Sequence, residues 1–183
     1  KYWLADVRYA EGQKHTQFFQ KTQNSQYLLS AYNNYSRAYQ LNRGEPAIAS
    51  EYAVSAAFLS AAIAAKDPEA ATQLAQQSLS LSQISISISP RHPNYYKSRA
   101  RTLILLSDFD PKFLKLAAEA LAKATQISPT DPRIPYNLGI IYKYLNATES
   151  AKTQFQKSLE LKPDFADPQA QLNDIMPLKS LSE

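Results

Sequence analysis

Apolar and small residues recur at helical spacing along most of the chain, and the pattern is clearest in residues 131–163. Two successive stretches of that segment place apolar residues three or four positions apart, which is typical of one face of an α-helix. Asp131 can cap the first helix, Gly139 allows the second helix to approach closely, and Pro163 ends the second helix. The segment therefore predicts two antiparallel helices joined by a turn at residues 146–148.

The same plan recurs towards the N-terminus. Pro129 and Pro163 are 34 residues apart, whereas Pro90 and Pro129 are 39 apart, and the excess of five fits a longer turn at residues 107–111. Helical pairs are also expected before Pro90. We expect a single domain of hairpins at about 1–41, 46–89, 92–128 and 132–162, followed by a C-terminal helix and tail at 164–183.

One segment of the predicted fourth helix is ambiguous. The run SLSLSQISISIS alternates polar and apolar residues, which favours a strand. However, it continues the helical face of Ala71, Leu74 and Ala75 without a break and ends at Pro90. We therefore favour a helix.

Six residues of the segment 131–163 lie at the spacings of the 34-residue tetratricopeptide (TPR) pattern, namely Leu138, Gly139, Tyr142, Ala151, Phe155 and Pro163. Ser158 stands where that pattern usually has alanine. The chain thus resembles TPR repeat domains. The resemblance implies an all-α superhelix of about four antiparallel helix hairpins with a short C-terminal capping helix. It also implies that the first helix of each hairpin lines a concave side where partners bind.

We predict the partner-binding residues by aligning the first helices on Gly139 and Ala100. The resulting concave set is basic and aromatic: Asn94, Lys97, Arg101, Arg133, Tyr136, Asn137 and Lys143. Residues 93–107 carry three cations and no acid, which suits an anionic group such as a carboxylate or phosphate.

Two alternatives stay open at this point. Lys97, Arg99 and Arg101 can equally form an ordinary solvated helix face. The tyrosines at positions 32, 35 and 39 can stack on sugars or bases, but their helical spacing favours packing against the next helix.

Composition narrows the class of function. Twenty basic and 16 acidic residues give a net charge of +4 that is spread along the chain, so no nucleic acid partner is expected. Cysteine is absent and the two histidines lie far apart, so we expect neither a metal nor another cofactor. No nucleophile stands in a catalytic motif, which predicts that the fragment is not an enzyme. The most apolar stretch, residues 52–65, is shorter than the roughly 20 residues that a bilayer requires, so this fragment is not expected to insert into a membrane.

The order of four segments, KYWLADVRYAEG, AYQLNRGEP, ISPTDPRIPYNLGIIYKYL and LELKPDFADPQAQL, resembles the soluble C-terminal region of bacterial O-antigen ligase-like membrane proteins. Arg43 departs from that pattern, which usually has proline there. The chain lacks an initiator Met and a visible signal peptide, so we expect an excised fragment. The resemblance implies a bacterial, membrane-associated parent whose last membrane helix precedes Lys1 and whose glycan transfer occurs outside this fragment.

The expected function is that of a scaffold for protein–protein interaction, which recruits or positions a protein or peptide partner in cell-surface polysaccharide assembly. A glycan-handling accessory domain and a structural spacer that self-associates, for example as a homodimer, are the alternatives.

Overall fold

A computed structural model describes residues 1–175, and within that range the chain is entirely helical, with nine α-helices and no strand. The expectation of an all-α fold is confirmed. The helices are α1 (Tyr2–Thr22), α2 (Ser25–Leu41), α3 (Pro46–Ile63), α4 (Pro68–Ile88), α5 (Pro93–Leu105), α6 (Lys112–Ile127), α7 (Arg133–Tyr144), α8 (Thr148–Leu161) and α9 (Ala166–Ile175). The predicted tail beyond Ile175 lies outside the described residues.

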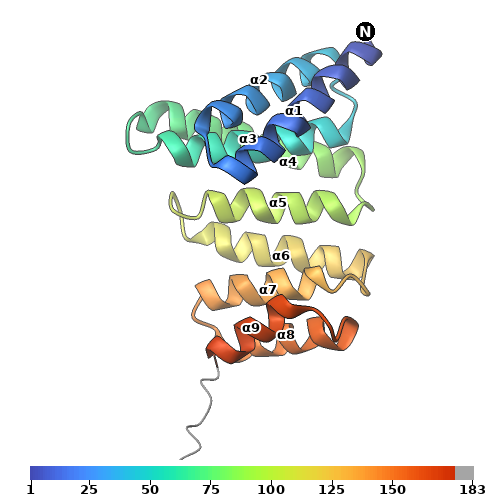
Figure 1. Ribbon diagram of the computed structural model, residues 1–183, viewed down its shortest axis with the longest axis vertical. Coiled ribbons are helices and arrows are strands. Elements are labelled where there is room, and N and C mark those ends of the chain that lie inside the picture. The colour runs from blue at the N-terminus through green and yellow to red at the C-terminus, as the bar shows by residue number, and fades with distance from the viewer. Residues whose placement is uncertain (176–183) are drawn as a thin grey trace, which may run out of the picture.

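The helices pair as antiparallel hairpins that stack along one axis. α1 packs on α2, α3 on α4, α5 on α6 and α7 on α8, and the second helix of each hairpin packs on the first helix of the next. Figure 1 shows this stack running from α1 and α2 at one end to α8 and α9 at the other. A lone hairpin cannot bury its apolar face, so each layer supplies part of the core of its neighbour.

The ambiguous serine-rich run is helical, because α4 continues unbroken to Ile88. Its buried positions include Ser78, Ser82 and Ser85, which are spaced three or four apart as on one helix face. The hydroxyls of Ser82 and Ser85 donate hydrogen bonds at 2.9 Å to carbonyls three residues earlier in their own helix. Ser82 and Ser85 are therefore buried with their hydroxyls satisfied, whereas the buried Ser78 hydroxyl has no hydrogen-bond partner among the described residues.

Local signals fix several helix starts. Proline is the first residue of α3, α4 and α5, where its missing N–H costs nothing. The Asp67 carboxylate accepts a hydrogen bond from the Ala70 N–H at 3.0 Å and so caps the start of α4.

Glycine allows close helix approach at both ends of the stack. A Cβ atom on Gly139 would lie 2.4 Å from Phe155 Cε1, and one on Gly12 would lie 2.5 Å from Tyr35 Cε1. The role of Gly139 was predicted, whereas that of Gly12 was missed. Gly12 lies 23 residues before Tyr35, but Gly139 lies only 16 before Phe155. The seven extra residues are about two helical turns, which keep the glycine on the same face but break the repeat spacing.

The tyrosines of α2 pack within the stack. Tyr35 is fully buried, and the rings of Tyr32 and Tyr39 lie 5.2 and 5.9 Å from the ring of Tyr52. Gln77 of α4 accepts a hydrogen bond from the Tyr32 hydroxyl and donates one to the Tyr52 hydroxyl. The packing interpretation is confirmed.

Of the described helices, α3 alone is long and apolar enough to cross a bilayer by length and composition. More than half of it is buried inside the stack, where it packs against α2, α4 and α5. A core helix meets the same two criteria, and this packing accounts for its apolar sequence.

Candidate functional site

The first helices of the hairpins, α1, α3, α5 and α7, together with α9 form one side of the stack, which we call the first-helix face. Hollows open along it between successive helices. The α5–α7 hollow has a volume of about 360 Å³ and brings together three of the seven predicted binding residues, Lys97, Arg101 and Asn137. Its apolar wall contains Ala100, Ile104, Leu105 and Leu121.

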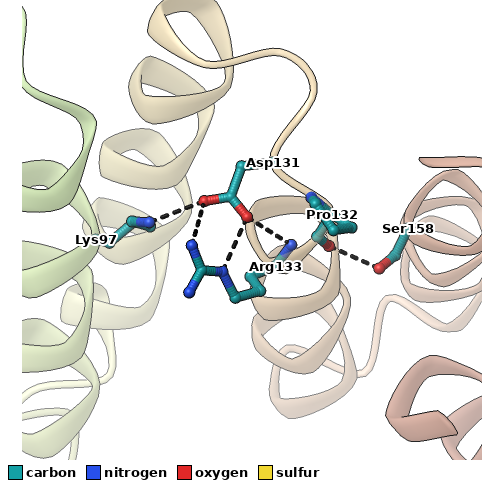
Figure 2. A network of polar contacts seen from close by, with 5 residues as sticks. All are labelled: Lys97, Asp131, Pro132, Arg133 and Ser158. Atoms are coloured by element: carbon teal, nitrogen blue, oxygen red, sulfur yellow. Dashed lines mark hydrogen bonds and ion pairs between the residues drawn. The ribbon is translucent and has the colours of Figure 1, made fainter. Parts of the chain in front are cut away.

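Lys97 is held by an ion pair that joins two repeats. Its Nζ lies 2.9 Å from Oδ2 of Asp131, and the Arg133 guanidinium donates to both oxygens of the same carboxylate at 3.0 and 3.2 Å. Oδ1 also accepts from the Arg133 backbone N–H at 3.0 Å, so Asp131 caps the start of α7 as predicted. Figure 2 shows these contacts converging on Asp131. One carboxylate thus neutralises part of the charge of two predicted binding cations.

The electrostatic state of Asp131 reflects two opposing causes. Burial by itself raises the pKa of its carboxyl group, but hydrogen bonds from Arg133 and Lys97 outweigh burial and lower the pKa to about 2. Asp131 is therefore ionised at neutral pH, and Lys97 stays paired with it. The sequence predicted the cap but not this contact, because Lys97 lies 34 residues away.

Arg101 differs from Lys97 and Arg133. Among residues 1–175 it has no carboxylate partner within ion-pair distance, and its side chain is exposed. Its guanidinium carbon lies 5.0 Å from the centre of the Phe58 ring, which lines a second hollow together with Arg101. Asn137 is half-buried on the opposite wall of the α5–α7 hollow. Both side chains carry N–H donors, the kind of group that binds a carboxylate.

The other predicted residues lie elsewhere on the first-helix face. Asn94 lines a different hollow. The Tyr136 ring packs 6.0 Å from that of Phe155 and 5.4 Å from that of Phe165. Lys143 donates to Gln171 at 2.9 Å and pairs with Asp174, which ties α7 to α9. Binding by these residues stays a prediction.

Arg99 of α5 lies at the contact between α4 and α5, where two successive hairpins pack on each other. It is half-buried, its Nη1 donates to Ser82 Oγ at 2.9 Å, and burial lowers the pKa of its guanidinium. Lys97, Arg99 and Arg101 therefore do not form a uniform solvated face, because only Arg101 is exposed.

Sequence reasoning did not single out Glu51, which lies in the middle of α3. It is partly buried, and burial raises the pKa of its carboxyl group while the charge of Arg101 opposes this effect. It lines two hollows, one shared with Arg101 and Phe58 and one shared with Tyr9 and Tyr95. The signal was present, because Glu51 is the one charged residue of the helix Pro46–Ile63.

We expect Glu51→Gln to raise the free energy of unfolding at pH 7. The raised pKa means that the folded state holds a proton on Glu51 more tightly than the unfolded state, whose ordinary value is 4.5. The wild-type protein therefore loses stability as the pH rises from 4.5 through the folded-state pKa, and the glutamine variant does not. Urea titrations at several pH values measure the difference, which should shrink below pH 4.5. An equal or lower stability of the variant at pH 7 would contradict the expectation.

In the part of the chain that the structure describes, no group of three His, Cys, Asp or Glu side chains could hold a metal ion. The chemistry of the first-helix face is instead that of charged and aromatic side chains around shallow hollows.

No family model matches the sequence. A search of curated proteins finds the BBSome complex member BBS4 of Mus musculus, which is 34% identical over 86 residues. The match covers 47% of this chain and 16% of the mouse protein. The chain therefore spans about one-sixth of the length of that relative.

Solved structures with similar folds include a chain of the APC/C hetero-tetramer Cut9-Hcn1, with a TM-score of 0.65 and 16% identity over 92% of this chain and 29% of that chain. PilF of Pseudomonas aeruginosa has a TM-score of 0.62 and 17% identity, covering 93% of this chain and 68% of PilF. A TPR protein of Thermus thermophilus has a TM-score of 0.50 and 15% identity, covering 92% of this chain and 98% of that protein's chain. The fold is a TPR-like superhelix of helical hairpins.

Proposed function

We propose that this TPR-like array is a scaffold that binds a protein partner on its first-helix face, with the α5–α7 hollow receiving a carboxylate of that partner. The supporting observation is the position of Arg101, an exposed guanidinium without a carboxylate partner among residues 1–175, beside a hollow of about 360 Å³. A hydrogen-bonded guanidinium–carboxylate pair inside a concave site provides both orientation and affinity.

The proposal gives different roles to the predicted cations. Lys97 and Arg133 hold Asp131 and so shape the hollow, whereas Arg101 contacts the partner. Asn137 supplies an amide donor from the α7 side. Tyr136 and Lys143 act mainly through their packing on α8 and α9, and Asn94 lies in a neighbouring hollow.

The similar proteins agree with a role in assembly. BBS4 is by its name a member of the BBSome complex, and the similar Cut9 chain was solved as a hetero-tetramer with Hcn1. These names support a non-catalytic scaffold, and we assign no enzymatic activity to this fragment.

Capture of partners by the isolated domain tests the proposal. We expect Arg101→Gln to weaken binding about 10- to 100-fold, because a hydrogen bond to a charged group contributes about 1.5–3 kcal/mol. Partners captured from lysate of the source cells are identified by mass spectrometry, and the affinity for each purified partner is then measured by calorimetry.

Arg37→Gln is the matched control, since it removes the same charge from an exposed position on α2. Unchanged circular dichroism shows that both variants are folded. Lys97→Gln is a poor test because it also breaks the pair with Asp131. Partners that bind wild type, the Arg101 variant and the Arg37 variant equally would overturn the role of the α5–α7 hollow.

We further propose that the parent protein is a bacterial O-antigen ligase-like membrane protein, and that this domain recruits a partner to cell-surface polysaccharide assembly. The support is the sequence resemblance alone. Detection of the parent chain in the membrane fraction, with loss of surface polysaccharide after deletion of residues 1–175, is the expected result. Normal polysaccharide in the deletion strain would contradict it.

Self-association is a second candidate function, and one observation favours it. Tyr2 and Trp3, at the start of α1, are 68% and 75% exposed, which leaves an apolar surface at one end of the stack. A mass that rises with concentration in light scattering, and that Trp3→Ser reduces to the monomer, is the expected result for a homodimer. A monomer mass at every concentration would remove this candidate.

A further inference from the structure

Glu51 stands out because no lysine or arginine among residues 1–175 forms an ion pair with it. Burial raises the pKa of its carboxyl group, and Arg101 acts on it only through its charge, without a hydrogen bond. Arg101 packs instead over the Phe58 ring. A carboxylate withdrawn from water without a bonded partner costs stability in the free protein.

The space beside Glu51 has the chemistry of a cation site. A hollow of about 270 Å³ lies between α1, α3 and α5, and we call it the Glu51 hollow. Tyr9 of α1 and Tyr95 of α5 contribute aromatic rings to its lining, and Ser50 and Ser98 contribute hydroxyls. Among the residues that the structure describes, its lining includes His92 but no lysine or arginine.

A second carboxylate adds to the negative potential there. Burial and the charges of Glu51 and Glu45 raise the pKa of Tyr9 to about 12, and burial and Glu45 raise the pKa of Tyr95. Both hydroxyls therefore stay neutral at physiological pH. In both tyrosines, nearby carboxylate charge contributes to the raised pKa. Glu45 is held in place by the hydrogen bond that it accepts from the Ala47 N–H.

We propose that the Glu51 hollow binds a lysine or arginine side chain of a partner protein. The cation would pair with the Glu51 carboxylate and lie against the Tyr9 and Tyr95 rings, which attract cations through their π faces. A phosphate or carboxylate would meet Glu51 and Glu45 and be repelled. The site therefore selects the charge opposite to the one selected by the α5–α7 hollow.

The two hollows are neighbours, because Ser98 of α5 lines both. A single partner segment that carries a basic and an acidic residue can therefore occupy both at once. This inference extends the proposed scaffold function and rests on it for the existence of a protein partner. Arg101 acts on Glu51 through its charge but does not line the Glu51 hollow.

A display library of random-sequence peptides, selected against the immobilised domain, tests the proposal. We expect peptides selected by the wild-type protein to be enriched in lysine or arginine at one position. Selection against Glu51→Gln should lose this enrichment, and a selected basic peptide should bind the variant at least about tenfold more weakly, as expected for loss of a charge-assisted contact.

Glu69→Gln is the matched control, since it removes the same charge from an exposed position on α4 and should retain the enrichment. Thermal unfolding followed by circular dichroism verifies that each variant is folded. Arg101→Gln separates the two sites, because it should lose enrichment of acidic residues and keep that of basic residues.

Absence of lysine and arginine enrichment in the wild-type selection, or the same enrichment with Glu51→Gln, would overturn the cation site. If the cation site fails this test but acidic residues are still enriched in a way that depends on Arg101, the proposed scaffold function stands and only the cation site is rejected. A selection that enriches no sequence at all contradicts both proposals.

Discussion

Gly139→Ala should destabilise the protein by about 2 kcal/mol, although alanine is the better helix former. The new Cβ would lie 2.4 Å from Phe155 Cε1, a distance at which atoms overlap. Phe155 cannot move aside easily, because it is fully buried among Ala151, Leu172 and their neighbours. The free energy of unfolding from urea titrations measures the effect.

Two further variants identify the cause. In a Phe155→Leu background the ring atoms are gone, so the cost of Gly139→Ala should fall by about 1 kcal/mol or more, which a double-mutant cycle detects. Gly44→Ala is the matched control, because its added Cβ would lie 3.7 Å from the Asn42 side chain, an ordinary contact. Equal effects at Gly139 and Gly44, or additive effects of Gly139→Ala and Phe155→Leu, would contradict the steric explanation.

Asp131→Ala should cost about 2–3 kcal/mol at pH 7. The change removes the hydrogen bond that caps α7, which contributes about 1 kcal/mol, and it leaves the Lys97 ammonium, whose side chain is 19% exposed, without its carboxylate. Because Asp131 joins α5 to α7, the loss should weaken the contact between adjacent hairpins. Urea titrations on both proteins measure the difference.

The pH dependence of this effect follows from the lowered pKa of Asp131. The carboxyl group has an ordinary pKa of 3.8 and a folded-state pKa of about 2, so its ionised form stabilises the folded protein. That contribution is complete well above pH 3.8 and is lost as the pH falls through about 2. The difference in free energy of unfolding between wild type and Asp131→Ala should therefore decrease as the pH falls over this range.

Asp110→Ala is a matched control within the same chain. Asp110 precedes Pro111 and Lys112 as Asp131 precedes Pro132 and Arg133, and it caps α6 in the same way. Among residues 1–175, its only ion-pair partner is Lys112 of its own hairpin, whereas Asp131 also pairs with Lys97 of the neighbouring hairpin. A loss of stability at Asp110 as large as that at Asp131 would show that the cap, and not the bridge between hairpins, explains the result.

The sequence determined the helices of this protein because the information needed for them is local. Apolar spacing, proline at helix starts and the Asp67 cap act within a few residues. The same kind of information identified Gly139 as a position of close helix approach, and the structure shows that Phe155 is the residue it faces. The helical state of the run at residues 78–89, which is helical as far as Ile88, could be inferred in the same way, although its alternation pointed to a strand.

Tertiary structure alone decided which charged side chains are paired within the fold and which are exposed. Lys97, Arg99 and Arg101 are equivalent by sequence, yet they contact Asp131, Ser82 and the Phe58 ring respectively. The sequence marked Glu51 as an isolated charge in an apolar helix, but only the stacking of α1 and α5 beside it created the surrounding hollow. Helix formation depends on neighbours along the chain, whereas ion pairing and burial depend on residues that stacking brings together from distant repeats. The fold therefore decided which cations of the first-helix face are paired and which are exposed.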